Sequence, residues 1–142
     1  MASRRTFLKA AVGVTAAGSV ILPAAGRARV PTFYKAVFDE RFADSRAFAK
    51  SAAERGMPTA AIRGDVTRLF YDDLDLRWKQ GPVLLTGCTT RASLFCLDLL
   101  ARDRGMRVAH CVAKPGNLVS WIIAPAHPGK WGPAGLARFS AL

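Results

Sequence analysis

The chain has 142 residues, of which 51% are hydrophobic and 22% are charged, as in one small folded domain rather than a disordered tail. Its formal net charge is +11 at pH 7, and four of the 21 basic residues precede Arg29. From Arg29 onward, 17 basic and 10 acidic residues leave a net charge of +7. These basic residues form no run and do not alternate with aromatic residues, which argues against a nucleic-acid groove. The charge fits a basic surface for an acidic partner or an anionic membrane.

The three cysteines, Cys88, Cys96 and Cys111, are an odd number, so one must stay unpaired if a bridge forms, and the sequence does not indicate a disulfide scaffold. No C-x-x-C or C-x-x-C-H motif occurs, so the sequence indicates neither a thioredoxin-like redox site nor covalently attached haem. No cofactor is indicated by any other motif.

The N-terminal segment Ser3-Arg4-Arg5-Thr6-Phe7-Leu8-Lys9 resembles the twin-arginine export signal S-R-R-x-F-L-K at every position, including Arg4, Arg5, Phe7 and Leu8. Residues 10–22 follow without a charge, and they are fewer than the ~20 residues that a membrane-spanning helix needs. Pro23 and small residues come next. Cleavage after Gly26 or Ala28 and an uncleaved signal that anchors the chain in the membrane are both compatible with this pattern.

This resemblance implies that the twin-arginine translocase exports the folded protein to a bacterial periplasm. Passengers of that route are typically cofactor-loaded redox proteins or small subunits that escort a partner without its own signal. We therefore expect residues 1–28 to be a signal peptide, 29–125 a single domain and 126–142 a Pro- and Gly-rich C-terminal arm.

Within the domain, β-rich and helical patterns alternate along the chain. The patterns predict strands over residues 32–38, 58–62, 83–86, 106–113 and 118–124, and helices over 41–55, 65–74 and 89–104. Residues 76–80, with Trp78, are expected to form a connection. These elements predict a small three-layer α/β fold, Rossmann-like or flavodoxin-like, with a mostly parallel sheet of four to five strands. The short link before residue 118 predicts an antiparallel strand at the edge.

Residues 81–112 read as one β-α-β unit, with a polar turn at 86–90 between a buried strand and a long helix. We expect the fourth strand to lie beside the third. The helix is apolar around much of its circumference. Its predicted core-facing stripe consists of Ala92, Phe95, Cys96, Leu99 and Leu100.

In a parallel sheet, ligands bind beyond the carboxyl ends of the strands. Four polar clusters follow the predicted strands, at residues 39–41, 63–65, 87–91 and 114–117. Hydroxyl groups and a helix N-terminus favour an anion there. The candidate ligand pocket comprises Asp39, Asp65, Cys88, Thr89, Thr90 and Arg91.

Thr86-Gly87-Cys88-Thr89 is similar to the T-G-x-T core of the flavodoxin phosphate loop, although in flavodoxins that loop follows the first strand. The simpler interpretation is that Thr89 or Thr90 caps the helix. A helix N-terminus would also lower the pKa of Cys88, for which His110 is the candidate base. Neither a G-x-S-x-G elbow nor a C-x5-R motif is present, so an unreactive or redox-labile thiol is favoured over a catalytic one.

His110 and Cys111 are adjacent on a predicted strand and point to opposite faces, so we expect no metal site. No complete catalytic set is found. The first functional hypothesis is an exported accessory subunit or escort that binds a larger periplasmic protein, for which a redox protein is one candidate. The alternative is a self-sufficient ligand-binding or enzymatic domain that uses the strand-end pocket.

Overall fold

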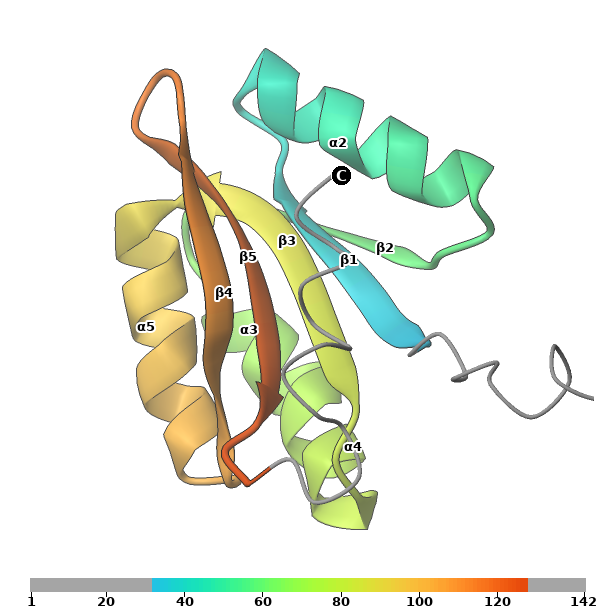
Figure 1. Ribbon diagram of the computed structural model, residues 1–142, viewed down its shortest axis with the longest axis vertical. Coiled ribbons are helices and arrows are strands. Elements are labelled where there is room, and N and C mark those ends of the chain that lie inside the picture. The colour runs from blue at the N-terminus through green and yellow to red at the C-terminus, as the bar shows by residue number, and fades with distance from the viewer. Residues whose placement is uncertain (1–31, 128–142) are drawn as a thin grey trace, which may run out of the picture. The chain divides into compact units, whose positions relative to one another are not determined.

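A computed structural model describes residues 32–127 of the chain (Figure 1). The predicted export signal, with Arg4, Arg5, Phe7 and Leu8, and nearly all of the predicted C-terminal arm lie outside the described residues. The elements are β1 (Phe33–Asp39), α2 (Ala43–Glu54), β2 (Thr59–Ile62), α3 (Thr67–Leu69), the π-helix η1 (Phe70–Leu74), α4 (Asp75–Gln80), β3 (Leu84–Thr90), α5 (Arg91–Arg102), β4 (Met106–Lys114) and β5 (Leu118–Pro125).

The fold is a small α/β fold, as predicted, built on one five-stranded sheet in the order β2-β1-β3-β5-β4. Strand β1 pairs in parallel with β2 and β3, whereas β5 pairs antiparallel with both β3 and β4. Strands β1 to β4 therefore all point the same way, and β5 alone runs against them. Helix α2 covers one face of the sheet, and α3, α4 and α5 lie on the other (Figure 1).

The predicted adjacency of the third and fourth strands is wrong, because β5 lies between β3 and β4. Burial explains this order. Six of the eight residues of β5 are buried, whereas β4 is buried only at Met106 and is otherwise at least partly exposed. A strand that is apolar on both faces belongs inside a sheet, and a polar strand with Arg107 and Lys114 suits its edge.

The predicted polar turn at residues 86–90 is also wrong, because these residues continue β3 as far as Thr90. Gly87 lies opposite Trp121 of β5, and a Cβ atom at Gly87 would overlap the indole ring. Two threonines of β3, one before and one after Gly87, form hydrogen bonds with Trp121. Its Nε1–H donates to Thr89 Oγ1 at 2.9 Å, and its carbonyl accepts from Thr86 Oγ1 at 3.0 Å. The glycine therefore makes room for a tryptophan instead of forming a turn.

Helix α5 buries a different face from the predicted one. Ser93, Leu94, Leu97 and Ala101 point into the core, whereas Phe95 is 63% exposed, Leu99 is 46% exposed and Cys96 is also exposed. The predicted side and the observed buried side of α5 are both apolar, so the periodicity of the sequence does not show which of them faces the core. The Ser93 hydroxyl donates to the carbonyl of Gly64 at 2.7 Å, which fixes the inward face of the helix.

Residues 76–80, predicted as a connection, belong to α4, and Trp78 is buried there. The Trp78 Nε1–H donates to the carbonyl of Val83 at 3.2 Å, which ties the end of this helix to the start of β3. None of the helices between residues 32 and 127 has the length and apolar character needed to cross a membrane.

We expect Gly87→Ala to lower the free energy of unfolding by about 1–3 kcal/mol, because the added methyl group overpacks against Trp121. Urea denaturation measures the loss. In a Trp121→Leu background, where the ring is absent, the same substitution should cost clearly less. Equal costs in the two backgrounds would show that the indole does not limit the space at Gly87.

Candidate functional site

The carboxyl ends of β1, β2 and β3 meet at one edge of the sheet, where the sequence predicts a ligand pocket. A chain of contacts joins Asp39, Gly64 and Thr90 at this edge. The guanidinium of Arg41 lies against Gly64, and the carbonyl of Gly64 accepts from Ser93. Two of the side chains that were expected to face a ligand, Asp39 and Thr90, are therefore engaged by neighbouring residues, Arg41 and Ser93.

Asp39 is fully buried, and its carboxylate forms two hydrogen bonds with the guanidinium of Arg41, at 2.9 and 2.7 Å. Its Oδ1 also accepts from the backbone N–H of Arg41 at 3.2 Å. Burial raises the pKa of the Asp39 carboxyl, but the hydrogen bonds and charge of Arg41, with the charge of Arg63, outweigh it. The net result is a pKa below the usual value, so Asp39 is an ion-paired carboxylate at neutral pH.

Thr90 caps α5, as the simpler interpretation of the sequence predicts. Its Oγ1 accepts from the backbone N–H of Ser93 at 3.2 Å and lies 3.0 Å from Ser93 Oγ. This hydroxyl is therefore committed to the start of the helix.

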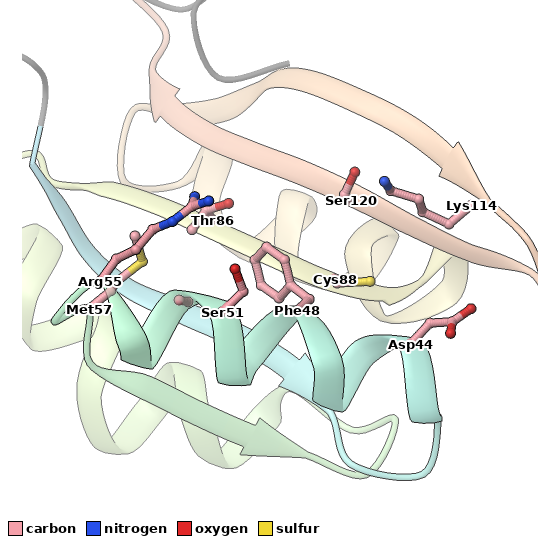
Figure 2. Close-up of a pocket in the computed structure, with 10 residues that line it drawn as sticks. Asp44, Phe48, Ser51, Arg55, Met57, Thr86, Cys88, Lys114 and Ser120 are labelled. Carbon is pink, nitrogen blue, oxygen red and sulfur yellow. The ribbon is translucent and has the colours of Figure 1, made fainter. Parts of the chain in front are cut away.

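The other four candidate residues lie in separate environments. Asp65 is exposed and accepts from the backbone N–H of Thr67 at 2.8 Å, and Arg91 is exposed on the first turn of α5. Thr89 lies beneath Trp121 on the face of the sheet that α5 covers. Cys88 points to the opposite face, towards α2 (Figure 2). The structure thus brings Asp39 and Thr90 towards Gly64 and directs Cys88 and Thr89 away from each other.

A pocket of about 360 Å³ lies over the face of the sheet that α2 covers (Figure 2). Cys88 is the one residue of the predicted set that lines it. Sequence reasoning missed the others, although residues 44, 48, 51 and 55 recur at helical spacing and mark a single side of α2. The lining consists of Asp44, Phe48, Ser51, Ala52, Arg55, Met57, Thr86, Cys88, Lys114 and Ser120.

Burial raises the pKa of the Cys88 thiol. A hydrogen bond with Ser45 and the charge of Lys114 act in the opposite direction, but they are the smaller effects. The expectation of a lowered pKa at a helix N-terminus is therefore wrong, because Cys88 lies within β3. The protonated thiol is a weak nucleophile.

His110 is not placed to act as a base for Cys88. Cys88 pairs with Ser120 of β5, whereas His110 pairs with Ile122 from the far side of β5. Strand β5 therefore lies between Cys88 and His110, and their partners on β5 are two residues apart. The Nε2 atom of His110 is buried and has no hydrogen-bond partner among the described residues.

No family model, no curated protein and no solved structure matches the chain. Between residues 32 and 127, no cluster of three or more His, Cys, Asp or Glu side chains is placed to hold a metal ion.

We expect Asp39→Asn to lower the free energy of unfolding by about 1–3 kcal/mol at pH 7, since charged hydrogen bonds are lost. A carboxylate whose pKa is lowered by folding stabilises the protein above its unfolded pKa of about 3.9. That contribution is lost as the pH falls through the folded pKa, so the variant and the wild type should converge in acid.

Urea denaturation at pH 7 and pH 3 measures both effects. Asp65→Asn is the matched control, because Asp65 is exposed, and it should cost less at pH 7. A difference between Asp39→Asn and the wild type that does not shrink at pH 3 would contradict the ion-paired state of Asp39.

Proposed function

We propose that the protein is an exported accessory subunit that binds a larger periplasmic partner through the outer face of α5. The observation that carries this proposal is that one apolar side of the helix is exposed, with Phe95 63% and Leu99 46% accessible to solvent. We call this surface the α5 stripe and define it as Ala92, Phe95, Cys96 and Leu99.

The α5 stripe is unusual for a surface helix, whose outer side is normally polar. Phe95 and Leu99 are one helical turn apart, and both are exposed. A partner that covered this side of the helix would remove the apolar surface of both from water. Scattered apolar residues on a surface need no explanation, whereas a contiguous apolar patch is typical of an interaction site.

A shallow hollow of about 260 Å³ runs beside the α5 stripe, between α5 and the loop at residues 64–67. Val66, Cys96, Leu99 and Leu100 give it apolar walls. Its size suits one large apolar side chain of a partner, and Phe95 lies next to it on the helix. An amphipathic helix that presents such a side chain fits this surface.

Arg91 lies at the N-terminal end of the stripe and forms no ion pair with any described residue. An acidic residue at the matching end of the partner helix would pair with it and set the direction of docking. The net positive charge of the chain favours such a partner.

The state of the strand-end residues supports an accessory role over catalysis at that edge of the sheet. Asp39 and Thr90 are already engaged by Arg41 and Ser93, and Cys88 has a raised pKa. The resemblance of residues 3–9 to a twin-arginine signal supports export in the folded state, through the translocase, to the periplasm.

Native mass spectrometry of the protein purified from the periplasm should show a stoichiometric complex with a larger protein. The double variant Phe95→Gln, Leu99→Gln should weaken that complex at least tenfold, because it removes the apolar contacts. Both side chains are exposed, so urea denaturation should show little change in stability.

Tyr71→Gln, Leu76→Gln is the matched control, since Tyr71 is 62% exposed and Leu76 is 59% exposed on other helices. This variant should retain the complex. A lone monomer, a complex between copies of this chain alone, or equal losses in the two double variants would each overturn the proposal.

A further inference from the structure

The pocket lined by Cys88 is separate from the α5 stripe, because α2 and α5 lie on opposite faces of the sheet (Figure 1). It follows the length of α2 (Figure 2). Arg55, Met57 and Thr86 lie at one end, Asp44 and Lys114 at the other, and Phe48 and Cys88 between them. This shape suits a ligand that is longer than it is wide.

The walls of the pocket are mainly apolar. Phe48, Ala52 and Met57 provide hydrocarbon and thioether surface, and a buried neutral cysteine behaves as a small apolar residue. A volume of about 360 Å³ lies in the lower part of the range for small-molecule sites. The pocket therefore favours the burial of an aliphatic chain.

The charges at the two ends of the pocket differ. At one end, the pocket is lined by an acidic and a basic side chain, Asp44 and Lys114, which form no ion pair with each other (Figure 2). At the other end no acidic residue lines the pocket, and the guanidinium of Arg55 forms no ion pair with any described residue. Figure 2 shows this guanidinium reaching from α2 towards Thr86 on the sheet.

A guanidinium without an ion pair beside an apolar channel is suited to a carboxylate, which it binds through two parallel N–H donors. The Thr86 hydroxyl cannot supply a further proton, because it donates to the carbonyl of Trp121. Arg55 is thus the principal donor at this end.

From this arrangement we infer that the pocket binds an elongated aliphatic carboxylate of medium chain length. The carboxylate pairs with Arg55, and the hydrocarbon chain lies between Phe48 of α2 and Cys88 of β3. This function is additional to partner binding by the α5 stripe and uses none of the same residues.

Calorimetric titration of the full chain with sodium decanoate below its micellar concentration tests the inference. One molecule of decanoate should bind per chain. Sodium acetate, which lacks the chain, and 1-decanol, which lacks the charge, should each bind at least tenfold more weakly.

Two variants locate the bound decanoate. Arg55→Gln should weaken binding at least tenfold, whereas Lys50→Gln, which removes the same charge from an exposed position of α2, should leave the affinity unchanged. Cys88→Met retains Arg55 but fills the middle of the pocket, so it should also abolish binding. Urea denaturation and circular dichroism verify that each variant is folded.

The inference is overturned if the wild type does not bind decanoate, or if Arg55→Gln and Lys50→Gln weaken binding equally. Binding that survives Cys88→Met would place the ligand elsewhere and would also overturn it. Because Phe95 and Leu99 are untouched, failure here leaves the proposed docking of a partner on the α5 stripe unaffected.

Discussion

The contact between the indole of Trp121 and the backbone of Gly87 sets the arrangement of the rest of the structure. It places β5 directly beside β3, which moves β4 to the edge of the sheet. It also keeps residues 86–90 extended, because Thr86 and Thr89 hold the tryptophan from either side of the glycine. Any side chain at residue 87 would push the two central strands apart.

Because side chains alternate along β3, this constraint also determines which residues reach the pocket beneath α2 and the start of α5. With Gly87 and Thr89 beneath Trp121, Cys88 has to face α2, where it lines the pocket instead of standing at a helix N-terminus. The strand then ends at Thr90, which caps α5 and brings Ser93 to Gly64. That contact turns Leu94 and Leu97 inward and leaves Phe95 and Leu99 in solvent.

The sequence predicts most elements of the fold, but it does not predict their long-range partners. In the segment that forms α2, helical spacing predicts one face with Phe42, Ser45, Ala49, Ala52 and Ala53. Ser45, Ala49 and Ala52 are indeed buried, whereas Phe42 is half-buried and Ala53 is exposed. In α5 two apolar sides compete, and the buried side is the one that places Leu94 and Leu97 in the core and lets Ser93 donate to the carbonyl of Gly64. Thr86-Gly87 reads locally as a turn, since the tryptophan that requires the glycine is 34 positions further along the chain. The pocket could not be predicted for the same reason, since its lining comes from α2, the α2–β2 connection, β3, β4 and β5, which are far apart in the sequence.

The three native cysteines allow the most direct test of the central claim, that the α5 stripe is a partner surface. Cys96 lies on the stripe, Cys111 is exposed on β4, and Cys88 is buried. The measurement is the rate at which each thiol reacts with a maleimide, in the isolated chain and in the proposed complex with a larger partner. We expect Cys96 and Cys111 to react rapidly and Cys88 slowly in the isolated chain, and only Cys96 to become slow in the complex. A Cys96 thiol that reacts equally fast in both states, or slowly in the isolated chain, would contradict the account.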